Sequence, residues 1–148
     1  MVRRLPFSPG SAHVTDVNSD FDTIGGEPVL RAVIDTFVDR VFDDLMIGFH
    51  FRNAKRKRIK RFEYEHAAEF LGAPVRYEGR SLAQAHAAHR IMGGHFDRRT
   101  QILREVLAHH EIREDIAQRW LRYVESLRSE ITRDARGQCV GSPSLRTR

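Results

Sequence analysis

The chain has 148 residues, of which 41% are hydrophobic and 30% charged, a composition that fits one soluble globular domain with a sizeable core. Its formal net charge of +5 permits a nucleic acid, an anionic membrane or an acidic ligand as a partner, but requires none of them. The single cysteine, Cys139, excludes an internal disulfide and a cysteine metal cluster, so we expect a reducing, cytoplasmic setting.

The two ends of the chain differ in composition from its middle. Residues 1–20 are polar and interrupted by prolines, so we expect a flexible N-terminal extension. Residues 133–148 contain a stretch rich in Gly and Ser and are expected to form a flexible C-terminal tail. No apolar run approaches the roughly 20 residues that span a bilayer, and no signal-peptide pattern follows the N-terminal arginines. Residues 21–132 are therefore expected to form a single domain.

The first strong pattern predicts a helix over residues 27–46. Pro28 suits a first helical turn, where its missing N–H costs nothing. Apolar residues then recur at spacings of three and four, as on one face of a helix; they are Val29, Leu30, Val33, Ile34, Phe37, Val38, Val41, Phe42 and Leu45. Gly48 is expected to break the helix, and His50 follows between two phenylalanines. Such aromatic residues can plug the edge of a core or line a pocket.

A densely basic run, Arg52–Arg61, leads into a second predicted helix over residues 54–71, with Asn53 as its N-cap and a stop at a Gly-Ala-Pro sequence. Helical spacing places four residues of this helix on one face; they are Ile59, Glu63, His66 and Ala67. A carboxylate among apolar side chains is costly, so Glu63 would be protonated or turned outward to pair with a lysine or arginine.

Three further helices complete the predicted architecture. A short helix over residues 81–89 carries His86 and His89, and a pair of glycines follows it. Apolar spacing then predicts helices over residues 94–109 and 113–131. No period-two alternation flanked by turns competes with these patterns. We therefore expect an all-α domain of four substantial helices and one short helix.

Three blocks of the sequence together resemble the truncated haemoglobins, most closely group I. They are FDTIGGEPVLRAVIDTFVDRV, EFLGAPVRYEGR, and AHAAHRI followed at His95 by HFD. The resemblance covers about residues 21–132. It implies a globin-like two-over-two helical sandwich around haem b, with O2, NO or CO bound at a histidine-ligated iron. The proximal histidine of the family falls on His86, and the phenylalanine that packs on the haem face falls on Phe51.

The opposite, distal half departs from the family pattern. The tyrosine that hydrogen-bonds bound oxygen, one residue after Phe37, would fall on Val38. The distal glutamine falls on Glu63, and the position one turn earlier falls on Ile59. A basic residue that meets a haem propionate is replaced by Phe62. The resemblance thus implies haem binding without the usual polar cage for tight oxygen binding, and any turnover would be redox chemistry such as NO or peroxide detoxification.

The chemistry of histidine suits this assignment. An imidazole can donate one ring nitrogen to iron while the other N–H bonds a carbonyl or water, which fixes the tautomer. The full set of residues expected around the haem is Phe37, Val38, Phe51, Ile59, Phe62, Glu63, His66, His86, Ile91 and Phe96. By position alone, the cations expected to meet the propionates are Lys60, Arg61 and Arg90.

Several alternatives remain open at this stage. Without the resemblance, His86 reads as an ordinary half-buried histidine; His89 is the other candidate ligand, and His66 or His50 could approach the sixth position of the iron. The chain could instead be a haem-free basic helical module that binds an acidic partner or nucleic acid through Lys55–Arg61. Nucleic acid is disfavoured because no aromatic residues interleave with these cations. We expect a monomer or weak homo-oligomer, with a reductase as partner if the protein turns over.

Overall fold

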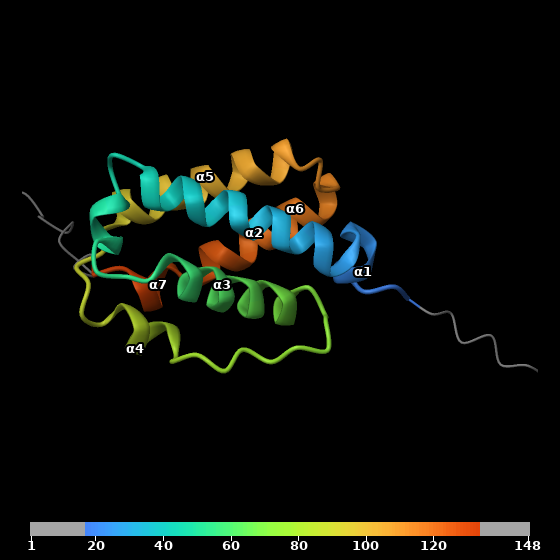
Figure 1. Ribbon diagram of the computed structural model, residues 1–148, viewed down its shortest axis with the longest axis horizontal. Coiled ribbons are helices and arrows are strands. Elements are labelled where there is room, and N and C mark those ends of the chain that lie inside the picture. The colour runs from blue at the N-terminus through green and yellow to red at the C-terminus, as the bar shows by residue number, and fades with distance from the viewer. Residues whose placement is uncertain (1–16, 134–148) are drawn as a thin grey trace, which may run out of the picture.

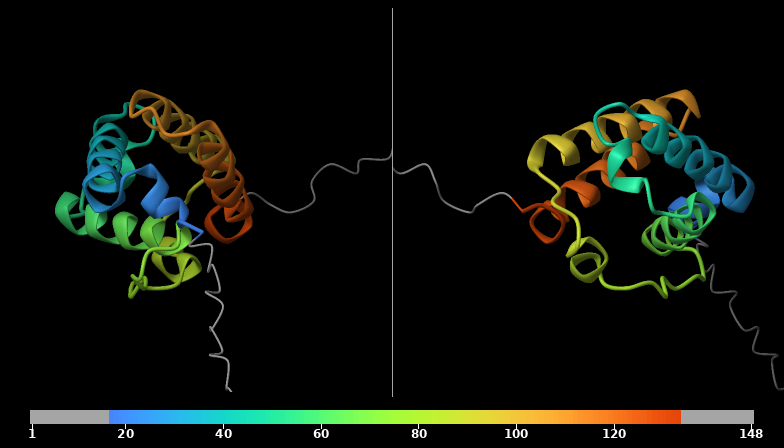
Figure 2. Two further views of the ribbon diagram at one scale, coloured as in Figure 1. Left: turned by 90° about the vertical axis from the view of Figure 1, so that its right-hand side faces the viewer. Right: turned by 60° about the vertical axis from the view of Figure 1, so that its left-hand side comes forward.

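Two pairs of helices enclose the centre of the molecule. The computed structural model describes residues 17–133; the predictions for residues 1–16 and 134–148 lie outside this range. Helix α2 (Gly26–Asp43) packs against α3 (Arg56–Phe70) and α5 (Gly93–His109), and α5 packs against α6 (Glu114–Ser126). The α2–α3 pair faces the α5–α6 pair (Figures 1 and 2). The described residues contain no strand, so the predicted all-α, two-over-two architecture is confirmed.

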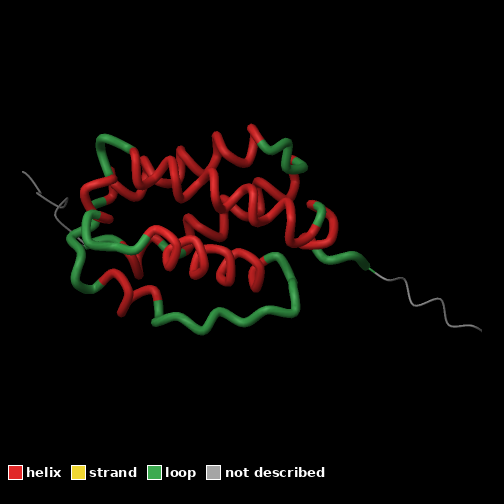
Figure 3. Tube along the Cα trace, viewed as in Figure 1, coloured by secondary structure: helices red, strands yellow, loops and turns green. Residues whose placement is uncertain are grey.

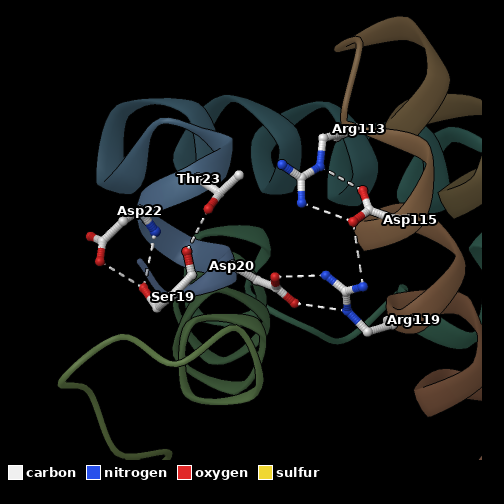
Figure 4. Close-up of polar contacts among 7 residues, drawn as sticks. All are labelled: Ser19, Asp20, Asp22, Thr23, Arg113, Asp115 and Arg119. Carbon is white, nitrogen blue, oxygen red and sulfur yellow. Dashed lines mark hydrogen bonds and ion pairs between the residues drawn. The ribbon is translucent and has the colours of Figure 1, made fainter. Parts of the chain in front are cut away.

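The fold begins with a short helix that the sequence did not predict, α1 (Asp20–Ile24). The side chain of Ser19 accepts a hydrogen bond from the backbone N–H of Asp22 and so caps this helix. The carboxylate of Asp20 then accepts two hydrogen bonds from the guanidinium of Arg119 on α6, at 2.7 and 3.1 Å (Figure 4). This ion pair joins the start of the domain to its last long helix.

Helix α2 buries the apolar stripe that the sequence predicts. Its buried residues are Leu30, Val33, Ile34, Phe37, Val38 and Val41. The helix ends three residues before the predicted boundary, because Asp44 adopts an extended conformation. The Asp44 carboxylate accepts hydrogen bonds from the N–H groups of Met46 and Ile47, at 2.9 and 3.2 Å, and forms an ion pair with Arg98. This local turn competes with continuation of the helix.

A short 3-10 helix, η1 (Gly48–Phe51), carries the chain from α2 towards α3. Gly48 is required there, since a Cβ at this position would lie 2.5 Å from the carbonyl oxygen of Phe42. Helix α3 then starts at Arg56 with Lys55 as its N-cap residue, so the expectation that Asn53 caps this helix was wrong.

A long loop returns from the end of α3 beneath that helix to α4 (Leu82–His86), as Figure 3 shows. Tyr77 fastens the loop: its backbone N–H bonds the Glu69 carboxylate on α3, and its hydroxyl donates to the carbonyl of Arg80 at 2.9 Å. Ser81 and Gln84 form a capping box at the start of α4. The helix ends at His86, three residues before the predicted boundary, and turns follow it.

The last predicted helix, over residues 113–131, forms two helices in the structure, because it is interrupted at Leu127. Helix α5, which precedes them, starts within one residue of its predicted boundary. Helix α7 (Arg128–Ile131) follows the interruption and packs against α4. No helix among residues 17–133 is long and apolar enough to cross a membrane.

Gly25 offers a test of how α1 is joined to α2. Its φ of +113° is in the left-handed region, and an added Cβ would lie 2.6 Å from Cγ2 of Val29. We expect Gly25→Ala to lower the free energy of unfolding by about 1–2 kcal/mol, measured by urea denaturation. Gly94→Ala is the matched control, because Gly94 is helical and a Cβ there meets nothing within 4 Å. Equal stability of the two variants would contradict this account.

Candidate functional site

A largely apolar cavity lies between the two helix pairs and is closed on one side by α4. Its walls contain nine of the ten residues that the sequence analysis places around a haem; these are Phe37, Phe51, Ile59, Phe62, Glu63, His66, His86, Ile91 and Phe96. As the sequence predicts, the residues Ile59, Glu63, His66 and Ala67 of α3 all face it. Helices α2, η1, α3, α4 and α5, together with Ile91 in the loop after α4, therefore present these side chains to one space.

His86, at the last position of α4, has the geometry of a metal ligand. Its Nδ1 lies 2.7 Å from the carbonyl oxygen of Leu82, one helical turn earlier. A carbonyl can only accept, so Nδ1 carries the proton and the lone pair is on Nε2. Burial lowers the pKa of His86, which keeps the ring neutral near pH 7. The side chain thus offers an unprotonated nitrogen inside the cavity.

The segment that carries His86 is held by few contacts. None of the five residues of α4 is fully buried, and only Leu82 and His86 are partly buried. Helix α7 packs against it, and Arg133 adds two bonds just beyond it. The Arg133 backbone N–H donates to the carbonyl of Ile91 at 2.8 Å, and its guanidinium donates to the carbonyl of Ala87. The C-terminal end of the domain therefore positions the histidine segment.

An ion pair crosses the cavity wall between α3 and α5. The guanidinium Nη2 of Arg99 donates to the Glu63 carboxylate at 2.7 Å, and both side chains line the cavity. The carbon of the guanidinium also lies 4.8 Å from the centre of the Phe37 ring. The sequence analysis expected Glu63 either to be protonated or to turn outward and pair with a lysine or arginine. Glu63 does pair with an arginine, but it remains at the cavity wall, with 29% of its side chain exposed.

On α2 the residues that line the cavity are Ile34 and Phe37. Val38 is only 1% exposed but does not line the cavity, so the structure does not bring it to the site. Successive residues of a helix point about 100° apart, and a polar side chain at position 38 would be directed into the core. Of the two α2 residues that the sequence analysis places around a haem, Phe37 lines the cavity and Val38 does not.

His66 is fixed by Tyr123 of α6, a residue that the sequence analysis does not place at the site. Its Nε2 lies 3.0 Å from the hydroxyl of Tyr123 on α6, and Tyr123 stacks on Phe70 with ring centres 4.2 Å apart. Burial lowers the pKa of His66, and the positive charge of Arg99 acts in the same direction. The ring is thus a neutral member of the cavity wall, held towards α6.

Three more histidines gather where η1 meets the start of α5. Nε2 of His50 lies 3.1 Å from Nδ1 of His95, and His95 Nδ1 also accepts from the backbone N–H of Met92. His50 must therefore be the donor in this pair. His89 lies nearby, with its ring centre 6.5 Å from that of His50, and all three histidines line the cavity.

The three cations expected to meet propionates do not line the cavity. Lys60 forms ion pairs with Asp35 and Asp39 on α2, and Arg61 lies near Glu65. Arg90 is exposed. Within the basic run as well, Arg56 pairs with acidic residues of α2, so part of the positive charge proposed for an acidic or nucleic-acid partner is already neutralised.

The residues present fit a planar, metal-containing cofactor. Among residues 17–133 there is no group of three or more His, Cys, Asp or Glu side chains that could hold a metal ion. A metal bound by His86 must then arrive with its other ligands already supplied, as the iron of haem does. The apolar walls match the faces of a macrocycle, while the histidines and Arg99 add donors at its edges or on its axis.

Among the lining residues that the sequence analysis did not place at the site are Arg99 and Tyr123, each of which contacts a predicted site residue. Both sit on predicted helices at positions that continue an apolar stripe: Arg99 follows Phe96 by three residues and precedes Leu103 by four. A charged residue inside an apolar stripe was the available signal. What the sequence could not supply was the partner of each, which lies on α3.

His66 gives the apoprotein a testable pH dependence. Because burial lowers its pKa in the folded protein, the unfolded chain binds the proton more tightly. The free energy of unfolding should therefore fall as the pH drops below about 6.5, the ordinary histidine value. We expect His66→Gln, which cannot titrate, to reduce this fall by at most about 1.4 kcal/mol per pH unit. Urea denaturation between pH 7 and pH 5 measures the effect.

Carboxylates do not interfere in this pH range. Asp44, for example, has its pKa lowered in the folded protein against its Arg98 partner, so its contribution is lost only at lower pH. An unchanged pH dependence in His66→Gln would show that His66 is not held neutral by the fold.

Comparison with known proteins agrees with this geometry. A family model described as bacterial-like globin matches residues 19–133. The group 1 truncated haemoglobin of Tetrahymena thermophila is 26% identical over 77 residues, which cover 52% of this chain and 64% of that protein. The group 1 truncated haemoglobin GlbN of Mycolicibacterium paratuberculosis is 33% identical over 78 residues, covering 53% and 57%.

The fold is also found among solved structures. The crystal structure of the truncated haemoglobin of Tetrahymena pyriformis in its Fe(III) form aligns with a TM-score of 0.73 at 20% identity, covering 78% of this chain and 98% of that one. The sequence matches to the first curated relatives are shorter, and span 57–64% of their lengths. Since the family model matches most of the chain, the protein belongs to the bacterial-like globin family.

Proposed function

We propose that this globin binds haem b through Nε2 of His86 and reversibly binds a diatomic gas, O2, NO or CO, on the opposite face. One observation carries the proposal: within an apolar cavity, Nδ1 of His86 is committed to the Leu82 carbonyl, which leaves Nε2 unprotonated and available. Membership of the bacterial-like globin family supports the same cofactor.

The protein's own part is to hold the ligand nitrogen and exclude water. The bond to Leu82 fixes both the tautomer and the direction of the His86 ring, which is the usual role of a partner behind a metal-bound histidine. Phe51, Ile91 and Phe96 offer apolar wall for the porphyrin. Haem, when bound, supplies an iron atom with one position left for a small ligand.

The distal side differs from a cage of neutral polar side chains. Ile34 and Phe37 are the α2 residues that line the cavity, and neither can donate a hydrogen bond from its side chain. The polar groups within reach are the Glu63–Arg99 pair and His66. Turnover of NO or peroxide would need electrons from a partner, for which a reductase is the natural class. The proposal itself requires only reversible binding.

Removal of the ligand side chain tests the proposal directly. We expect purified protein supplied with haem to show a Soret band, and His86→Gly to lower haem affinity by more than about a hundredfold, because the metal ligand itself is lost. Free imidazole can enter the space left by the side chain and should restore the spectrum of the parent. Absorbance titration with haem measures each affinity.

His89→Ala is the matched control, since His89 lies three residues further along the same segment and also lines the cavity. Its haem affinity should stay within about threefold of the parent, a change of well under 1.4 kcal/mol. Loss of binding in His89→Ala with retention in His86→Gly would transfer the ligand role to His89. Absence of a Soret band in the parent would overturn the proposal.

A further inference from the structure

The Glu63–Arg99 pair is the feature of the cavity that haem binding alone does not require. A charge placed among apolar side chains is costly unless it is paired, and neither residue is needed to fill the wall. Yet Arg99 projects from α5 beside Phe96 and Leu103, which are almost completely buried. The fold thus maintains a permanent cation at the cavity, because a guanidinium stays protonated at any ordinary pH.

The position of Arg99 is fixed from two sides. Its Nη2 is 2.7 Å from the Glu63 carboxylate, and its guanidinium lies over the Phe37 ring at 4.8 Å. A guanidinium carries five N–H donors, and the bond to Glu63 uses one of them. The side chain is therefore both oriented and able to donate further hydrogen bonds to a group in the cavity.

The chain also places this pair near the proposed iron ligand. Arg99, Glu63 and His86 line the same cavity. Glu63 and Phe37 come from α3 and α2, whereas His86 comes from α4. A ligand on the iron, held between these elements, would meet Arg99 as its nearest cation among the residues that line the cavity.

We propose that Arg99 donates a hydrogen bond to the ligand of the haem iron, and that Glu63 limits the strength of this interaction because it shares the guanidinium. The site is thereby suited to small inorganic anions such as azide, fluoride or nitrite. This inference rests on the proposed haem binding. A charged donor strengthens a hydrogen bond to an anion far more than one to a neutral molecule. Low-dielectric surroundings increase the difference. An incoming anion must compete with Glu63 for the guanidinium, so Glu63 limits the affinity.

The experiment compares ligand affinities of the haem-loaded protein. The ferric form is titrated with azide and fluoride, and the ferrous form with CO as the neutral probe, all followed by absorbance. We expect Arg99→Met to weaken azide and fluoride binding by about ten- to hundredfold, the value of a hydrogen bond to a charged group. CO affinity should change by less than about threefold. Glu63→Gln should strengthen anion binding, because the competing carboxylate is gone.

Arg98→Met is the matched control. Arg98 is the adjacent arginine on the same helix, but it pairs with Asp44 outside this cavity, so it removes the same net charge without touching the site. Its anion affinities should match those of the parent. If Arg98→Met and Arg99→Met weaken anions equally, the effect is one of overall charge and the inference is wrong.

A second measurement does not depend on haem. In the apoprotein, Glu63→Gln and Arg99→Met should each lower the urea midpoint, and the double variant should recover part of the loss, since each single variant leaves one charge without its partner. Additive losses would show that the pair does not form. If haem fails to bind the parent, the proposed function fails; if haem binds but neither variant alters anion affinity, only this inference fails.

Discussion

Helix α2 must bury its apolar stripe against two other helices at once, and the rest of the fold follows from that constraint. α3 and α5 both pack on α2, and α6 packs on α5. The space that remains between α3 and the α5–α6 pair is the cavity. The cavity is continuous with the hydrophobic core. Ile34 and Phe37, for example, are buried core residues that also border the cavity. The site is thus a direct result of how the helices share α2.

Within that cavity the chemistry is unevenly distributed. The α4 side offers a neutral imidazole whose second nitrogen is committed to a carbonyl. The α3 and α5 side holds a carboxylate and a guanidinium, and His66 is turned towards Tyr123. A bound molecule would therefore find a nitrogen lone pair on one face and a permanent dipole of opposite charges on the other. On the two proposals made above, the α4 side would hold the cofactor and the α3 and α5 side would select its ligand.

Much of this could be predicted from the sequence, for reasons visible in particular residues. The spacing on α3 correctly placed Ile59, Glu63 and His66 on one face, since helix periodicity is a local property. Val38 shows the limit: it follows Phe37 directly, but successive helical residues point about 100° apart, and Val38 does not line the cavity. The pairing of Glu63 with Arg99 spans 36 residues, and no local pattern encodes it. Likewise, α1 and the interruption at Leu127 depend on caps and tertiary contacts, which propensity does not contain.

The absence of buried residues in α4 has a kinetic consequence. A segment with little apolar contact can open locally without unfolding the domain. The core of α2, α5 and α6 would then persist while residues 82–91 move away, with α7 and Arg133 as their remaining attachments. Exchange of a cofactor held by His86 would accordingly be a local event with its own rate, set by the opening of this segment and separate from global stability. The lifetime of the haem-bound protein would then depend on α7 and Arg133, which hold the α4 segment in place.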